Sequence, residues 1–184
     1  ANVISKLPNE ICRKLREAGC RKLAFGFESG SENVLRRINK RSNCREALES
    51  VRKCESHGIL VEAYLIFSFP FETLKDIVDT IEFVIGIKKI APSSDIWSGK
   101  YNAFPGTTVY RECVEKYGIK KVESLEEWGN PPNYIGYHPW ESQLQKMLLK
   151  VAMTLIYLDP DPKSYWKTHR GERFLRKMLK LVRY

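Results

Sequence analysis

Short apolar runs alternate with amphipathic stretches over the first two-thirds of the chain. Short apolar runs between turn residues are typical of buried strands. Three segments have this pattern, the last more weakly than the others, and are predicted strands: residues 22–28, 60–67 and 95–103. Five further stretches repeat apolar residues at helical spacing and are predicted helices: residues 8–18, 31–38, 43–57, 74–87 and 108–116.

This alternation of helices and strands predicts the fold class. Strands that are linked through helices run parallel, with right-handed crossovers. Three or four strands are too few to close an eight-stranded barrel. We therefore expect an α/β fold, either an open sheet or half of a partial (βα) barrel. After about residue 120 a Pro-, Gly- and aromatic-rich loop leads into further helical stretches, which predicts a sheet part at residues 1–120 and an α-helical C-terminal extension at residues 121–184.

Composition narrows the class of protein. The chain has 184 residues, 43% of them hydrophobic, and no apolar run near the roughly 18 residues of a membrane span. Its five cysteines are widely spaced and include no Cys-x-x-Cys, which indicates reduced thiols in a cytoplasmic protein. Residues 141–184 carry ten Lys and Arg against four Asp and Glu, so most of the net charge of +9 lies there. The first residues look like the interior of a helix or strand, so we expect this chain to be a piece of a longer protein.

Polar side chains follow each predicted strand. Glu28 and Ser29 end the first, Ser68 and Glu72 follow the second, and Asn102 lies at the end of the third. Because the carboxyl ends of parallel strands meet at one edge, a ligand there would meet carboxylates, hydroxyls and exposed backbone groups. A carboxylate suits a ribose diol or an ammonium group, since it accepts several hydrogen bonds.

A structural role is the alternative for each of these residues. Glu28 and Ser29 could cap the helix that follows them, and Glu72 could be a first-turn carboxylate. Asn43 and Thr73 also stand where a helix begins, and both residue types are good N-caps. The three histidines show no metal-ligand spacing, and the chain has no phosphate-binding glycine motif and no nucleophile elbow.

Three segments together resemble a known family. Residues 18–40, centred on Phe-Gly-Phe-Glu-Ser-Gly-Ser at 25–31, are similar to the middle of radical S-adenosylmethionine (SAM) enzymes. Residues 64–73 look like that family's next strand end, usually Gly-x-Pro-Gly-Glu-Thr, and residues 104–110 look like its sixth-strand turn. The resemblance implies a (βα)6 partial barrel of which this chain supplies the second half. Residues 155–160 also resemble the extension of cobalamin-binding members of the anaerobic porphyrin-ester cyclase type.

The resemblance implies an activity and a set of cofactors. Reductive cleavage of SAM by a 4Fe–4S cluster would give a radical that abstracts hydrogen from a small-molecule substrate, with cobalamin as a further cofactor in the subgroup. The cluster motif Cys-x-x-x-Cys-x-x-Cys is absent, so its ligands would lie in the N-terminal half of the same enzyme, and this chain alone would be inactive. By resemblance, the cofactor-binding residues are Glu28, Ser29, Phe67, Ser68, Phe69 and Asn102. Ser68 and Phe71 replace two family glycines, which puts close backbone contact with adenine in doubt. The resemblance assigns no catalytic residue and no metal ligand.

A binding module is the competing interpretation. Tyr134, Tyr137 and Trp140 lie before a basic segment, and aromatic side chains beside a basic surface are typical of nucleic-acid or tRNA-modifying proteins. The basic residues of 173–183 also fit the solvated face of an amphipathic helix, and a membrane-surface helix at 174–184 is a third alternative.

Overall fold

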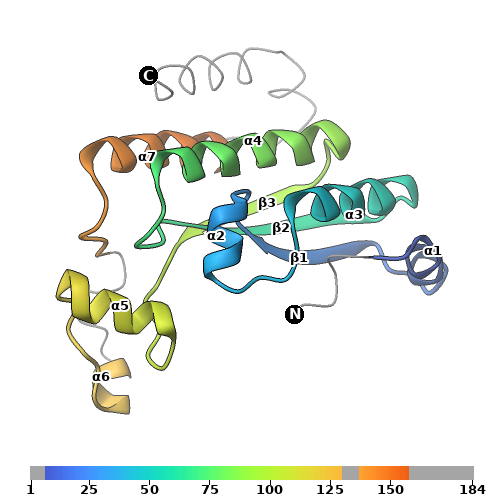
Figure 1. Cartoon of the computed structure of the whole chain (residues 1–184). Coiled ribbons are helices and arrows are strands. Elements are labelled where there is room, and N and C mark those ends of the chain that lie inside the picture. Colours follow the sequence, from blue (N-terminus) through green and yellow to red (C-terminus); the bar gives the residue numbers. More distant parts are fainter. Residues whose placement is uncertain (1–6, 130–136, 158–184) are drawn as a thin grey trace.

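The computed structural model describes residues 7–129 and 137–157 and shows helices on one face of a small sheet (Figure 1). The sheet has three parallel strands in the order β1 (Lys22–Glu28), β2 (Leu60–Phe67) and β3 (Asp95–Lys100). The described helices are α1 (Asn9–Glu17), α2 (Glu32–Arg37), α3 (Cys44–Ser56), α4 (Leu74–Ile90), α5 (Thr108–Tyr117), α6 (Leu125–Gly129) and α7 (Gln143–Tyr157). The predicted α/β fold with parallel strands and a C-terminal helix is confirmed.

Alternating side chains give the sheet two different faces. Phe25 and Phe27 of β1 and the odd-numbered residues of β2 are buried against α3 and α4. The opposite face leaves Tyr64 43% exposed and Trp97 48% exposed. The sheet is therefore covered by helices on one side and open on the other, as in a barrel wall (Figure 1).

Local capping explains where most helices begin. The side chains of Ser31, Asn43, Thr73 and Thr107 each accept a hydrogen bond from a backbone N–H in the first turn of the following helix. Thr73 forms a full capping box with Asp76. The predicted caps at Asn43 and Thr73 are confirmed, and the same chemistry fixes the exits of β1 and β2.

The third strand is shorter than predicted. It ends at Lys100 rather than at residue 103, because its partner β2 ends at Phe67, which is paired with Lys100. The Tyr101 N–H still donates to the Phe67 carbonyl (2.7 Å), and beyond it no ladder partner is available. Asn102 therefore lies in a loop beside the end of β2.

The helix α7 packs into the same core as the sheet. Leu148, Leu149 and Ala152 are buried against Phe67 and the apolar side of α4. The division of the chain at residue 120 stays a prediction, and the amphipathic helix considered for residues 173–183 lies outside the described residues. Within the described ranges, no helix combines the length and apolar character that a bilayer crossing needs.

Gly30 offers a direct test of this packing. A Cβ there would lie 2.7 Å from Thr80 Cα and 2.9 Å from the Asp79 carbonyl oxygen, both backbone atoms of α4. Gly30→Ala should therefore force the β1–α2 turn away from α4 and lower the free energy of unfolding by about 1–3 kcal/mol, measured by chemical denaturation.

Gly99→Ala is the matched control, because a Cβ at Gly99 meets nothing within 4 Å. Equal stability of the Gly30→Ala variant and the wild type would show that α4 does not hold this turn.

Candidate functional site

The carboxyl edge of the sheet carries strained backbone at two neighbouring strand ends. Glu28 has a φ of +66° and Ser68 a φ of +67°, a left-handed conformation that suits glycine. Such residues cost on the order of 1–3 kcal/mol and cluster at functional sites. A register irregularity between Gly26 and Glu28 adds to the distortion at the end of β1. This edge is the candidate site.

Glu28 lies on the open side of the sheet and meets a lysine. Its Oε1 is 3.2 Å from Lys40 Nζ, and the two side chains are 26% and 15% exposed. A Cβ at Gly26 would be 2.5 Å from Glu28 Oε1, so the carboxylate occupies the space that this glycine leaves. Phe25 and Phe27 face the core, hence Gly26 and the carboxylate above it belong to the opposite face.

Sequence reasoning missed Lys40. Asn39 has a φ of +55°, and the Lys40 N–H donates to the Leu35 carbonyl, so the chain turns back at the end of α2. This turn brings the Lys40 ammonium over Glu28. Asn is one of the residues that tolerate this conformation, so Asn39 was the signal in the sequence for a turn that carries Lys40 back toward Glu28.

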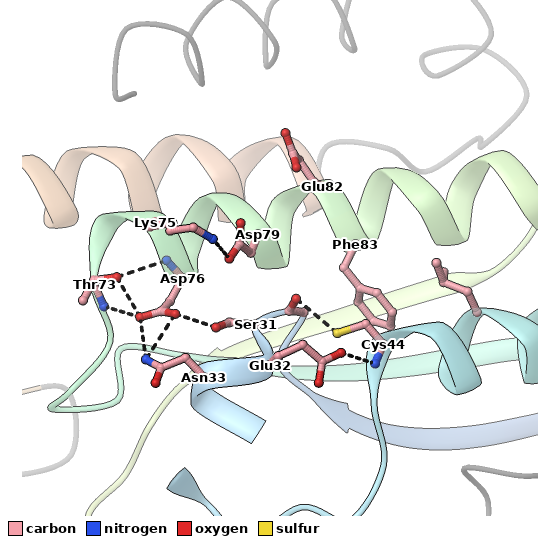
Figure 2. A pocket seen from close by; sticks show the side chains of 12 residues that line it. Ser31, Glu32, Asn33, Cys44, Thr73, Lys75, Asp76, Asp79, Glu82 and Phe83 are labelled. Carbon is pink, nitrogen blue, oxygen red and sulfur yellow. Dashed lines mark hydrogen bonds and ion pairs between the residues drawn. The ribbon is translucent and has the colours of Figure 1, made fainter. Parts of the chain in front are cut away.

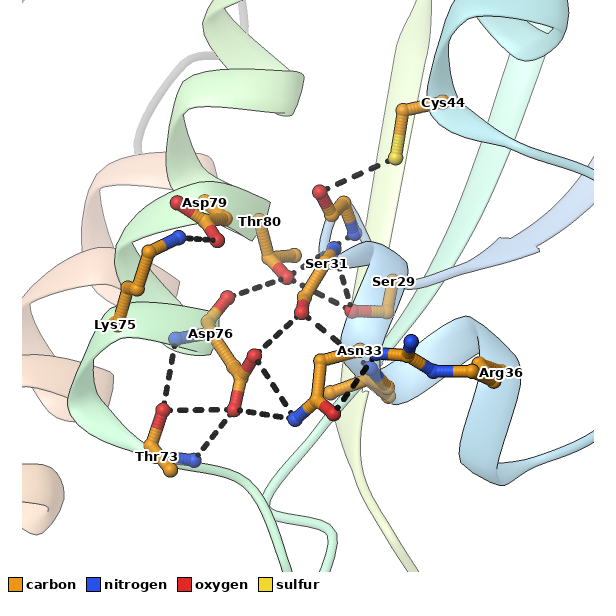
Figure 3. A network of polar contacts seen from close by, with 12 residues as sticks. Ser29, Ser31, Asn33, Arg36, Cys44, Thr73, Lys75, Asp76, Asp79 and Thr80 are labelled. Carbon is orange, nitrogen blue, oxygen red and sulfur yellow. Dashed lines mark hydrogen bonds and ion pairs between the residues drawn. The ribbon is translucent and has the colours of Figure 1, made fainter.

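Ser29 points the other way, into the helical layer. Its Oγ is 3.0 Å from Thr80 Oγ1, and Thr80 Oγ1 also accepts from the Gly30 N–H (Figure 3). Ser29 is buried, so its hydroxyl pins the β1–α2 turn to α4. The structure thus separates Ser29 from Glu28, which the sequence analysis had grouped.

Asp76 completes this attachment. Its carboxylate accepts from the Ser31 hydroxyl (2.5 Å), the Thr73 N–H and hydroxyl, and the Asn33 amide (Figure 3). Burial disfavours its charge, but these donors outweigh burial and lower the pKa of Asp76. The exits of β1 and β2 are therefore joined through the start of α4.

A cavity of about 630 Å³ adjoins this network on the helical side (Figure 2). Its lining includes Ser31, Glu32, Cys44, Asp79 and Phe83, and none of the six predicted cofactor-binding residues. It is therefore separate from the candidate edge.

Ser68 is held by three separate side chains. Its N–H donates to Glu72, its hydroxyl donates to Glu141 Oε1 (2.5 Å), and its carbonyl accepts from Trp140 Nε1 (3.0 Å). Lys100 pairs with Glu141 at 2.8 Å. Both backbone groups of Ser68 are thus engaged within the protein, and a ligand could reach only the second lone pair of its carbonyl.

The two carboxylates around Ser68 are in different electrostatic environments. Burial raises the pKa of Glu72 to about 8. Burial also opposes the charge of Glu141, but Lys100 and the Ser68 hydroxyl outweigh it and lower the pKa of Glu141. Glu141 is the ionised partner of Lys100, whereas Glu72 favours its neutral form.

The remaining predicted residues expose little side chain. Phe67 is fully buried in the core under α7, and Phe69 stacks between Phe71 and Tyr101 at ring distances of 5.5 and 5.0 Å. Phe71 also lies under the Arg37 guanidinium, 3.9 Å from its ring centre. The aromatic ring at position 71 thus fills space where the resembled family has a glycine. Asn102 is half-buried beside the end of β2.

A family match covers the first two strands of the sheet. Residues 3–84 match the model of the Radical SAM superfamily. These residues belong to a radical SAM domain. The matched region contains β1, β2 and most of α4, and with them the Glu28 and Ser68 turns.

Several curated relatives align with the chain at low identity. It is 26% identical over 160 residues to an uncharacterized methyltransferase of Pyrococcus horikoshii, covering 85% of this chain and 33% of the relative. It is 32% identical over 155 residues to the tRNA-2-methylthio-N(6)-dimethylallyladenosine synthase of Finegoldia magna, covering 78% and 32%. It is 27% identical over 108 residues to the bacteriochlorophyllide d C-12(1)-methyltransferase of Chlorobaculum tepidum, covering 58% and 23%. The chain spans about a third or less of each relative.

The described residues contain no ligand set for an iron–sulfur cluster. Among residues 7–129 and 137–157, no group of three His, Cys, Asp or Glu side chains could hold a metal ion. Cys12, Cys54 and Cys113 are fully buried packing residues. For SAM itself, the partly exposed carboxylate of Glu28 beside Lys40 offers a suitable donor and acceptor pair.

Glu72 makes the stability of the chain depend on pH in a specific way. In the folded state it keeps its proton up to about pH 8, whereas its ordinary pKa is 4.5. Between these values the folded state holds a proton that the unfolded state has released, so the free energy of unfolding falls as pH rises. The contribution is at most about 1.4 kcal/mol per pH unit.

Glu72→Gln should remove this contribution, because glutamine does not titrate. Chemical denaturation at several pH values between about 5 and 8 should show a steeper loss of stability in the wild type than in the variant. Parallel curves would show that Glu72 is ionised in the folded protein.

Proposed function

We propose that this chain forms the second half of the barrel of a radical SAM enzyme, and that the carboxyl edge of its sheet binds SAM. The observation that carries the proposal is the Glu28 carboxylate, presented on the open face at a strained strand end within the matched region. The cluster ligands would lie in another segment of the same enzyme, and the cluster would supply the electron for reductive cleavage of SAM.

Each part of the edge has a distinct task in this proposal. Glu28 accepts hydrogen bonds from the ribose hydroxyls or the ammonium group of SAM, and charge-assisted bonds of this kind are strong. Lys40 forms an ion pair with Glu28 and offers a cation to the SAM carboxylate. The backbone of Phe67–Phe69 and the Asn102 amide would contact the adenosyl group, while Ser29 acts indirectly by fixing the turn to α4.

The relatives suggest transfer of a one-carbon group. By their names, two are methyltransferases and one is a synthase of 2-methylthio-N(6)-dimethylallyladenosine in tRNA. We favour methyl transfer to a small molecule, and cobalamin enters the proposal through the resemblance of residues 155–160 and the methyltransferase relatives.

A tRNA substrate is the second candidate, favoured by the alignment with the Finegoldia synthase. Of the three predicted stacking aromatics, Trp140 is turned inward and donates to Ser68, whereas Tyr137 is 54% exposed. Tyr134 and the basic residues after 157 lie outside the described residues. Retention of tRNA by the full-length protein on a filter, lost on removal of residues 158–184, would favour this candidate.

Glu28→Gln tests the SAM site. In the full-length enzyme with its cluster, the loss of one charge-assisted hydrogen bond should weaken SAM affinity by about one to two decades, or about 1.5–3 kcal/mol. Equilibrium binding and thermal unfolding are measured side by side. Glu17→Gln on α1 is the control, because Glu17 lies in an exposed ion pair with Arg13 on the same helix.

Unchanged SAM affinity together with a large drop in the thermal midpoint would identify Glu28 as a structural residue. The proposed function would then fail at its central contact.

A second test uses the chain by itself. Since no cluster ligands are expected in it, residues 1–184 should take up no stoichiometric 4Fe–4S cluster after anaerobic reconstitution and should not cleave SAM. Visible absorbance and iron analysis provide the measurement, and a full cluster in this piece would contradict the division of the enzyme proposed above.

A further inference from the structure

The segment that contains Trp140 and leads into α7 crosses the ends of two strands. We call residues 138–145 the strap. His138 Nε2 donates to the Tyr101 carbonyl (2.9 Å), and Gln145 Nε2 donates to the Glu72 carbonyl (2.8 Å). Between these two anchors, Trp140 and Glu141 both bind Ser68.

The strap stabilises the left-handed turn at Ser68, where the β2 exit has no glycine. Serine at a φ of +67° is strained, and a residue in this conformation persists only when its surroundings hold it there. Trp140 holds the Ser68 carbonyl and Glu141 holds its hydroxyl, while Lys100 at the end of β3 balances the Glu141 charge. A glycine at this position would need neither contact to adopt the same φ.

Burial makes this arrangement specific. Ser68 is 2% exposed and the Glu141 side chain 3% exposed, so neither group can exchange its partner for water. A buried carboxylate that lost Lys100 or Ser68 would be uncompensated. The Ser68 hydroxyl is therefore the group through which Glu141 of the strap holds the turn.

We propose that Glu141 is a positioning residue that, together with Lys100 and Trp140, fixes the left-handed turn at Ser68 and so sets the backbone at the carboxyl end of β2. The consequence for SAM binding rests on the proposed function. The fixing of the turn itself does not, and it can be tested by stability alone.

The experiment is a rescue in the full-length protein with its cluster, with four variants: wild type, Glu141→Gln, Ser68→Gly and the double variant. Glu141→Gln should weaken SAM affinity about tenfold, because the turn is no longer held against a strain of this order. Ser68→Gly added to Glu141→Gln should restore most of that affinity, since glycine adopts the turn unaided. A purely structural Glu141 would lower the thermal midpoint without moving SAM affinity, and Ser68→Gly would rescue neither.

Thermal midpoints of the four variants give an independent reading. The loss caused by Glu141→Gln should be smaller in the Ser68→Gly background than in the wild type. The strap proposal is overturned if the two substitutions lower the thermal midpoint additively, or if Ser68→Gly fails to restore SAM affinity. In either case the wild type still binds SAM. If the wild type binds no SAM, the proposed function fails, and the non-additivity of the midpoints still decides the role of Glu141.

Discussion

Parallel pairing places the ends of all three strands at one edge, where the ladder no longer supplies partners for the backbone. Buried backbone N–H and C=O groups need partners, so side chains from other elements must take over. Thr80 accepts from the Gly30 N–H at the β1 exit, and Glu72 and Trp140 bind the two backbone groups of Ser68 at the β2 exit. These side-chain hydrogen bonds, which replace the missing strand partners, determine the shape of the candidate site.

The two exits solve this problem with different chemistry. At β1, Gly30 has no side chain, so α4 packs directly against the turn. The hydroxyls of Ser29 and Thr80 are then close enough to hydrogen-bond. At β2, Phe71 stacks on Phe69 and fills the space that a glycine at position 71 would leave open, and the Glu141–Lys100 pair holds the turn. The first exit therefore leaves Glu28 free to face the open side, whereas the second restricts access to the backbone of residues 67–69.

The sequence could predict the features that depend on residues close together in the chain. The strands, the parallel order and the caps at Asn43 and Thr73 follow from patterns within a few residues. Lys40, Asp76 and Glu141 bind partners that are 12, 45 and 73 residues away, and no local pattern marks such pairs. The predicted end of the first strand at Glu28 is confirmed, but the direction of Ser29 depends on Thr80, which only the tertiary structure brings near it.

The central claim is that SAM binds along the carboxyl edge formed by all three strand ends. Hydrogen–deuterium exchange of the full-length, cluster-containing protein with and without SAM tests it most directly. The account predicts slower exchange on SAM addition in the backbone of residues 26–31, 67–73 and 101–107, with α1 unaffected. Protection that misses both residues 67–73 and 101–107 would contradict it.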